Sequence, residues 1–169
     1  MDIEYRKAKI SDAQGIINIM KKGIKSGSWK YTLRNTFDKT KLDRLKKNLK
    51  DKNSTQKIYI AYDNESKKVI GSLFFGLEDG RFRHKVELGW NILDEYSGRG
   101  ITTNLVKFVL VKLKKMGIKK VGAEMAKENI GSYKIALKCG FKEEGIKKFG
   151  MIGDKGQRID MIIMGKILD

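Results

Sequence analysis

The spacing of apolar residues switches between two periods along this chain, and the order of those switches constrains the fold most. Strands bury every second residue, whereas helices bury residues three or four apart. Segments with period two are 3–8, 58–62, 69–77, 82–93, 118–125 and two strands that flank a turn at 153–156. Segments with helical spacing are 16–24, 42–49, 101–116 and 129–139. The order β-α-α-β-β-β-α-β-α-β-β predicts a mixed α/β (α+β) fold, and the absence of a linker in 169 residues predicts one domain over 1–169.

Short polar signals mark several ends of these segments. Ser11 and Gln14 stand three residues apart before the first helical segment, a spacing that predicts a capping box. Asp38 or Thr40 is expected to cap the second helix, and Gly117 to end the third. The three strands over 58–93 are separated by short polar turns, which predicts an antiparallel meander.

The composition argues against several classes of protein. Cys139 is the single cysteine and His84 the single histidine, so neither an internal disulfide nor a Cys/His metal site is expected. Cys139 without a partnering histidine is expected to pack as a small apolar residue. No apolar run approaches the roughly 18 residues that span a bilayer. We expect a soluble, cytoplasmic protein with no metal and no membrane partner.

The net charge of +17 comes from 37 Lys and Arg against 20 Asp and Glu. Such a charge attracts polyanions, for example nucleic acid, a ribosome or a phosphorylated cofactor. The lysines are spread along the chain and form no aromatic-interleaved basic stripe. A solvated surface therefore stays the alternative interpretation.

The most informative passage is the glycine-bearing loop that joins the strand over 82–93 to the helix that begins near Ile101. Gly98 and Gly100 bring the backbone N–H groups of a helix start close to one point, where the helix dipole adds positive charge. Arg99 stands where it can add charge-assisted hydrogen bonds. The loop therefore predicts an anion site, although an ordinary tight turn would have the same two glycines. Neither nucleotide fingerprint fits, because the Walker ending is missing and Thr103 replaces the third Rossmann glycine.

The passage resembles the acetyl-CoA motif of the GNAT superfamily, Gln/Arg-x-x-Gly-x-Gly/Ala, with Ser97, Gly100 and Thr102 at the fixed positions. Gly100 matches the motif, whereas Ser97 and Thr102 depart from it but retain donors for phosphates. Residues 129–145 resemble the Asn-x-x-Ser helix that ends in Gly-Phe and precedes Glu-Gly in a ribosomal-protein N-acetyltransferase-like branch. Residues 86–90 resemble that branch's Ala-Glu-Ile-Gly-Tyr strand.

The resemblance implies a GNAT fold, with a splayed, mostly antiparallel central sheet of about seven strands flanked by about four helices. It also implies acetyl-CoA as co-substrate, with pantetheine lying in the gap of the sheet as a pseudo-strand. The residues that it assigns to acetyl-CoA are Asn91, Ile92, Leu93, Ser97, Gly98, Arg99, Gly100, Ile101, Thr102, Thr103, Asn129, Ser132 and Lys134. Asn129 is by its own pattern a helix N-cap, and the two roles are compatible.

Acetyl transfer to an amine requires a neutral nucleophile, so a carboxylate base is expected. A lysine amine with a pKa near 10.4 costs about 3 kcal/mol more to deprotonate than an α-amine with a pKa of about 8. Glu124 and Glu87 match positions where relatives carry a glutamate, and a strand-edge salt bridge with a lysine is the alternative for each. For protonation of the leaving thiolate, Ala136 stands where many relatives have tyrosine, which leaves Ser132 and Tyr133 as candidates. Both hydroxyls could equally be cap or core contacts.

The acceptor is expected near 26–37, with Trp29, Tyr31 and Arg34, and near the last hairpin over 149–158. The predicted function is transfer of acetyl from acetyl-CoA to a primary amine by direct attack in a ternary complex. The amine belongs to a protein N-terminus or a small molecule, with a ribosome-associated or acidic partner favoured by the charge. The alternative is a GNAT-fold module that binds CoA or RNA without catalysis. The protein is expected to be a monomer or homodimer.

Overall fold

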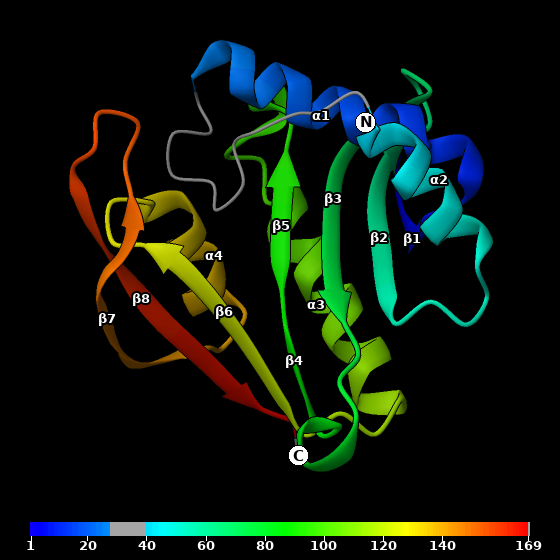
Figure 1. The fold of residues 1–169 in the computed structure, drawn as a ribbon. Coiled ribbons are helices and arrows are strands. Elements are labelled where there is room, and N and C mark those ends of the chain that lie inside the picture. The colour runs from blue at the N-terminus through cyan, green and yellow to red at the C-terminus, as the bar shows by residue number, and fades with distance from the viewer. Residues whose placement is uncertain (28–39, 169) are drawn as a thin grey trace.

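The computed structural model describes residues 1–27 and 40–168 (Figure 1). Its helices are α1 (Ala13–Ser26), α2 (Lys41–Lys50), α3 (Ile101–Lys115) and α4 (Ile130–Lys138). Its strands are β1 (Ile3–Lys7), β2 (Gln56–Asp63), β3 (Lys68–Gly76), β4 (Lys85–Glu87), β5 (Gly89–Ile92), β6 (Lys120–Ala126), β7 (Lys142–Ile152) and β8 (Arg158–Ile167). The predicted α/β order is confirmed with one difference, since the strand expected over 82–93 is two strands.

The strands form two four-stranded sheets, in the orders β1-β2-β3-β5 and β4-β6-β8-β7. All neighbouring pairs are antiparallel except β4 and β6, which run parallel from Lys85 beside Lys120 to Glu87 beside Gly122. The Leu88 N–H donates to the Gly122 carbonyl at 2.9 Å, after which β5 joins β3 instead. The sheets therefore meet at β4 and spread apart beyond it (Figure 1).

The strand predicted over 82–93 is divided into β4 and β5 for a reason that the spacing of apolar residues does not show. Residues 80–82 form a 3₁₀ turn, so β4 begins at Lys85. The side chains of Val86 and Leu88 are both buried in the core, and the alternation of period two continues across the break. What changes at Leu88 is the strand that supplies the hydrogen bonds.

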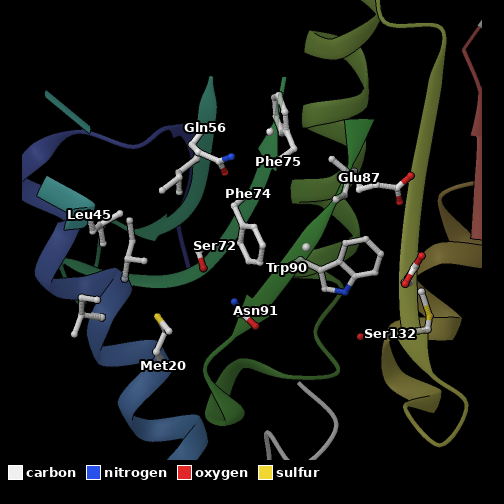
Figure 2. Close-up of a pocket in the computed structure, with 18 of the residues that line it drawn as sticks. Met20, Leu45, Gln56, Ser72, Phe74, Phe75, Glu87, Trp90, Asn91 and Ser132 are labelled. Carbon is white, nitrogen blue, oxygen red and sulfur yellow. The ribbon is translucent and has the colours of Figure 1, made fainter. Parts of the chain in front are cut away.

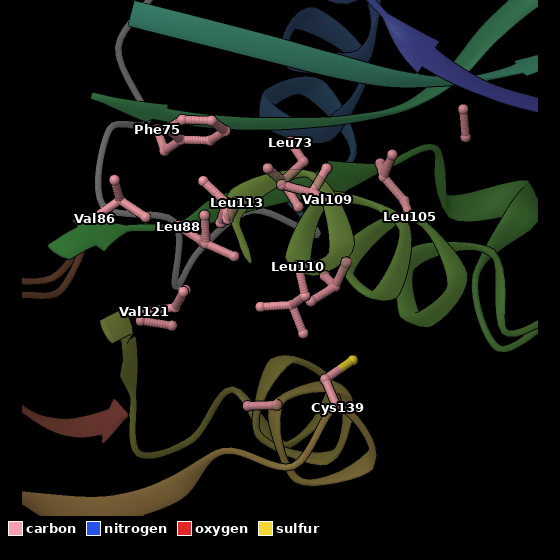
Figure 3. Packing of buried hydrophobic residues seen from close by; sticks show 14 of the residues in the cluster. Leu73, Phe75, Val86, Leu88, Leu105, Val109, Leu110, Leu113, Val121 and Cys139 are labelled. Carbon is pink, nitrogen blue, oxygen red and sulfur yellow. The ribbon is translucent and has the colours of Figure 1, made fainter. Parts of the chain in front are cut away.

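Helices cover both faces of the first sheet. On one face α3 places Leu105, Leu113 and their neighbours against Leu73 and Phe75 of β3, all fully buried (Figure 3). Tyr59 of β2 stacks on Phe75 with ring centroids 6.1 Å apart. On the other face α1 packs against β3. Side chains of β3 thus point alternately toward α3 and toward α1.

Cys139 follows α4 and packs where α4 meets α3 (Figure 3). The thiol is buried and donates to the Thr103 carbonyl oxygen, with Sγ 3.6 Å from that oxygen. Burial raises the pKa of the Cys139 thiol above its ordinary value. These observations agree with the predicted packing role.

The capping box predicted at Ser11 and Gln14 is wrong. Residues 10–12 form a 3₁₀ turn, and α1 begins one residue later at Ala13. The buried Asp12 carboxylate accepts the Lys9 backbone N–H at 2.6 Å and pairs with both terminal nitrogens of Arg6 at 2.7 and 3.0 Å. A carboxylate with a fixed guanidinium partner is a stronger acceptor than a serine hydroxyl. Thr40 occupies the position before α2, but its side chain makes no capping hydrogen bond there. Asp38, the other predicted cap, lies outside the described residues.

Helix lengths and acidic clusters add two findings for residues 1–27 and 40–168. No helix there is both long and apolar enough to cross a membrane. In the same residues no three His, Cys, Asp or Glu side chains gather into a group that could hold a metal ion.

Candidate active site

Two adjoining cavities lie along the gap between β5 and β6, one of about 670 Å³ and one of about 370 Å³. Trp90 and Asn91 of β5 line both cavities, as do Asn129 and Ser132 at the start of α4. The cavities therefore share a wall, and their other lining residues differ in chemistry.

The smaller cavity is built around the start of α3. Gly98 and Gly100 adopt positive φ values of 75° and 78°, a conformation that glycine reaches without steric cost. The Asn104 N–H donates to the Gly100 carbonyl at 3.0 Å, and the three N–H groups before it in the helix have no carbonyl one turn back. Those N–H groups and the helix dipole suit a phosphate.

Most residues predicted to contact acetyl-CoA line this cavity. They are Asn91, Ile92, Ser97, Gly98, Gly100, Ile101, Thr102, Thr103, Asn129, Ser132 and Lys134. Leu93 and Arg99 are the exceptions. Leu93 is buried, and its N–H donates to the Ile70 carbonyl at 2.9 Å. The Arg99 guanidinium lies over the Tyr96 ring, 5.5 Å from its centroid.

The buried carboxylate of Asp63 fixes the position of Tyr96, the residue before the glycine loop. Asp63, at the end of β2, accepts the Ser66 hydroxyl at 2.6 Å and the Tyr96 hydroxyl at 3.2 Å. The hydrogen bond from Ser66 is the largest of the contacts that lower the pKa of Asp63. Tyr96 is itself a lining residue of the smaller cavity. The first sheet thus fixes where the glycine loop begins.

The strands on the two sides of the gap present backbone edges that no described strand pairs. β5 bonds to β3 from Gly89 to Ile92, and β6 bonds to β4 only as far as Gly122. Residues 123–126 of β6 continue beside β8 alone. Within residues 1–27 and 40–168, both facing edges are therefore available to an extended ligand that carries amide groups.

Glu87 of β4 lines the larger cavity (Figure 2). Its carboxylate lies over the backbone of Gly122 in β6. A Cβ atom at position 122 would lie only 2.2 Å from both Glu87 carboxylate oxygens, so glycine makes room for this carboxylate. Burial, followed by the nearby charge of Glu124, raises the pKa of Glu87 above its ordinary value. No hydrogen bond or ion pair joins the Glu87 carboxylate to another described side chain. It is a carboxylate suited to accept a proton.

Glu124 lines the same cavity but has a partner. Lys147 of β7 places its ammonium 2.8 Å from each carboxylate oxygen of Glu124. The contact reaches across β8, which separates β6 from β7. The strand-edge salt bridge considered for both glutamates is thus observed at Glu124.

The two hydroxyls considered as proton donors lie in different surroundings. Ser132 lines both cavities, and its N–H donates to the Asn129 side-chain oxygen at 3.1 Å, so Asn129 is the N-cap of α4. Tyr133 lines neither cavity, and its hydroxyl donates to Glu143 at 2.5 Å. Trp29, Tyr31 and Arg34, predicted to bind the acceptor, lie outside the described residues.

Comparison with known proteins now identifies the family. The model of the acetyltransferase (GNAT) domain matches residues 2–142. The chain belongs to the GNAT acetyltransferase family. The predicted enzyme class, an acyltransferase, is thereby confirmed at the level of the family. An uncharacterized N-acetyltransferase of Bacillus subtilis, YoaA, is 28% identical over 83 residues, which are 48% of this chain and 46% of that protein. The match therefore spans about half the length of this curated relative.

Solved structures share the GNAT fold over almost the whole chain. The ribosomal-protein-S5-alanine acetyltransferase of Vibrio fischeri has a TM-score of 0.86 at 21% identity, covering 100% of this chain and 94% of its own. The ribosomal-protein-alanine N-acetyltransferase of Brucella melitensis has a TM-score of 0.80 at 20% identity, with 98% and 99% covered. The yncA protein of Salmonella typhimurium, solved with its cofactor acetyl-CoA, has a TM-score of 0.81 at 18% identity, with 99% and 94% covered.

Sequence reasoning missed one wall of this GNAT site. The larger cavity is bordered by apolar side chains from α1, α2 and the sheet: Ile16, Ile17, Met20, Leu45, Ile58, Phe74 and Phe75 (Figure 2). In the sequence these residues look like ordinary core positions, because their periods are those of buried faces. The signal that they share a cavity is the contact between elements distant in sequence. Gly122 and Lys147 were missed for the same reason.

Proposed function

We propose that this protein transfers the acetyl group of acetyl-CoA to a primary amine, by direct attack of the amine in a ternary complex. The observation that carries the proposal is the shared wall of the two cavities, which have a phosphate-type loop in one and the Glu87 carboxylate in the other. A cofactor with phosphates, an amide-bearing arm and a terminal thioester matches that sequence of environments. When bound, acetyl-CoA supplies the acetyl group as a thioester.

The described residues fit acetyl-CoA in three ways. The loop over 97–103 offers helix N–H groups to phosphates, and Lys134 and Lys138 add positive charge to the same cavity. The open edges of β5 and β6 offer hydrogen bonds to the two amides of pantetheine. Asn129 and Ser132, which line both cavities, stand where the pantetheine arm would pass.

Glu87 is the base that we favour over Glu124. Glu87 carries a raised pKa and no ion-pair partner among the described residues, whereas Glu124 is paired with Lys147. In the reaction the amine gives a proton to Glu87, its nitrogen forms a bond to the acetyl carbon, and the bond from that carbon to sulfur breaks. The departing thiolate takes a proton from Ser132 or from water, which leaves Tyr133 as the weaker candidate because its hydroxyl bonds to Glu143.

Two observations bear on the class of the acceptor. Structural neighbours named as ribosomal-protein-alanine acetyltransferases, together with the net charge of +17, support a protein N-terminus on a ribosome-associated or acidic partner. A small-molecule amine fits the same chemistry. Use of acetyl-CoA supports a cytoplasmic location.

The test is release of the CoA thiol from acetyl-CoA in the presence of amines, for wild type, Glu87→Gln and Glu124→Gln. We expect Glu87→Gln to lower kcat by about a hundredfold or more, a typical contribution of a general base. Glu124→Gln, which has the same change in charge, serves as the matched control and should retain most activity. Binding of acetyl-CoA without amine-dependent release from any acceptor would contradict catalysis and favour a CoA-binding module.

A further inference from the structure

The larger cavity has two walls of opposite chemistry. Glu87 and Glu124 provide carboxylates on the side of β4 and β6. The facing wall, on the side of α1 and α2, is mainly apolar and includes Met20, Leu45 and Phe74 (Figure 2). Its polar members are Lys41, Gln56 and Ser72. An acceptor that fills the cavity from the carboxylates to this wall would meet both kinds of surface.

Phe74 is the most informative residue of the apolar wall. Its neighbours in β3, Leu73 and Phe75, are 0% and 1% exposed, whereas Phe74 is 45% exposed although it lines a cavity. The ring lies against Gly89 of β5, where a Cβ atom would approach it to 2.4 Å. Because Gly89 has no side chain, the Phe74 ring has room to lie beside Trp90 and to line the cavity (Figure 2). Apolar surface of this kind inside a concave site is typical of a ligand contact.

We propose that the acceptor is a primary amine joined to an aromatic or branched aliphatic group, with the amine at Glu87 and the apolar group against Phe74, Leu45 and Met20. This inference rests on the proposed function and names the class of its acceptor. The free amine of an apolar small molecule and the N-terminus of a peptide that begins with an apolar residue share this chemistry.

The charges of the site discriminate against other amines. The carboxylate of Glu87, which has no ion-pair partner among the described side chains, attracts an approaching ammonium group and repels an acceptor that carries a carboxylate beside its amine. A diamine would place its second ammonium against the apolar wall, where the loss of hydration opposes binding. A compact polar amine would leave the apolar wall in contact with water, so burial of that wall would add nothing to its binding free energy.

The experiment compares matched pairs of acceptors in CoA-thiol release. One pair is 2-phenylethylamine against ethanolamine, and the other is a tripeptide that begins with phenylalanine against one that begins with serine. Putrescine serves as the diamine. We expect kcat/KM to be at least about tenfold higher for the apolar member of a pair, since even small changes in apolar contact give such ratios. The pair that shows the preference identifies the source of the acceptor.

Two variants locate the preference on this wall. Phe74→Ser should reduce kcat/KM for the preferred apolar acceptor about tenfold and leave that for its polar partner nearly unchanged. Phe82→Ser is the matched control, because Phe82 is 59% exposed and lines neither cavity. Leu45→Gln on α2 repeats the test from a second element, in case Phe74→Ser disturbs the sheet. Calorimetric titration of 2-phenylethylamine into each variant supplies a measurement that does not depend on turnover.

The outcomes separate this inference from the function on which it rests. Equal turnover of polar and apolar acceptors, or binding of 2-phenylethylamine that survives both Phe74→Ser and Leu45→Gln, would overturn the acceptor class while the transferase stands. Failure of every acceptor, with acetyl-CoA bound, would overturn the transferase itself. Selective loss of the apolar acceptor in both wall variants would support the proposal.

Discussion

At the scale of single residues, the site contrasts two glutamates that the sequence could not rank. Both occupy positions beside the gap, and both line the larger cavity. Lys147 forms an ion pair with Glu124, whereas Glu87 lies over Gly122 without an ion-pair partner among the described side chains. The nearby charge of Glu124 also raises the pKa of Glu87. The carboxylate with an ion-pair partner, Glu124, therefore raises the pKa of the carboxylate without one, Glu87.

This arrangement predicts a shift in the pH profile of Glu124→Gln. Glu87 acts as a base only when ionised, so kcat/KM should fall as the pH drops through its raised pKa. Removing the negative charge of Glu124 lowers that pKa, so the acidic limb should move to lower pH. The measurement is kcat/KM against pH for wild type and Glu124→Gln. An acidic limb that stays in place, or moves to higher pH, would show that Glu87 is not the titrating base.

Gly122→Ala should act on catalysis through Glu87. The added methyl carbon would overlap the Glu87 carboxylate oxygens, which must then move away. Since that carboxylate is the end of a flexible side chain, the stability should change little. We expect a fall in kcat of tenfold or more, because a displaced base loses its hydrogen-bond geometry. Thermal unfolding that remains within a few degrees of wild type, together with unchanged activity, would refute this role of Gly122.

At the scale of elements, the glycines of the loop before α3 have two roles. They allow its backbone conformation, and they leave the space beside the smaller cavity open. Gly98 and Gly100 have positive φ, and a Cβ atom at either position would meet nothing within 4 Å. The loop therefore needs glycine for its backbone conformation, and an added methyl would project into open space beside the cavity. Tyr96, tied to Asp63, fixes where this loop leaves the sheet.

Gly98→Ala and Gly117→Ala separate these two effects. Both glycines have positive φ, 75° and 81°, with open space around them, so each substitution should cost about 1–2 kcal/mol in stability. Only Gly98 lines the smaller cavity. We expect similar losses in Tm for both variants and a rise in Kd for acetyl-CoA for Gly98→Ala alone. Equal affinities in calorimetric titration would place the phosphates elsewhere.

The elements also show what sequence patterns can and cannot predict. The helices α3 and α4 and the final hairpin follow from apolar period and from Gly117 and the turn at 153–156, because these signals are local. The break at Leu88 was missed because a change of partner strand leaves the period intact. The cap at Ser11 was misassigned because Arg6, five residues upstream, fixes Asp12 instead. The glycine loop could be predicted from the spacing of its residues. The apolar wall could not, because its residues come from elements that are distant in sequence and meet only in the folded structure.

At the scale of the whole molecule, the excess of positive charge surrounds a site proposed to take a ligand with several phosphates. Lysines lie on nearly every element, and Lys134 and Lys138 border the smaller cavity itself. A field of this sign raises the rate of encounter with anions and is screened by salt. Such a field would favour capture of an anionic cofactor without any nucleic-acid partner.

Ionic strength should therefore act on cofactor capture more than on chemistry. We expect KM for acetyl-CoA to rise several-fold between about 20 mM and 0.5 M salt, because screening weakens the attraction to its phosphates. The value of kcat should change little, since Glu87 lies in the neighbouring cavity rather than at the phosphate loop. Steady-state kinetics over a salt series provide the measurement. A KM that is independent of salt would mean that the basic surface plays no part in binding acetyl-CoA.

The edges of β5 and β6 that no described strand pairs have a consequence for how long the protein survives proteolysis. A ligand that bonds to both edges joins the two sheets, so it binds the folded chain and not the unfolded one. At a ligand concentration a hundred times its Kd, such binding adds about 2.7 kcal/mol to the free energy of unfolding. Proteases remove chains that open, and their access falls as that free energy rises. We expect the half-life of this protein under proteolysis to lengthen as the concentration of acetyl-CoA rises and to shorten as it falls.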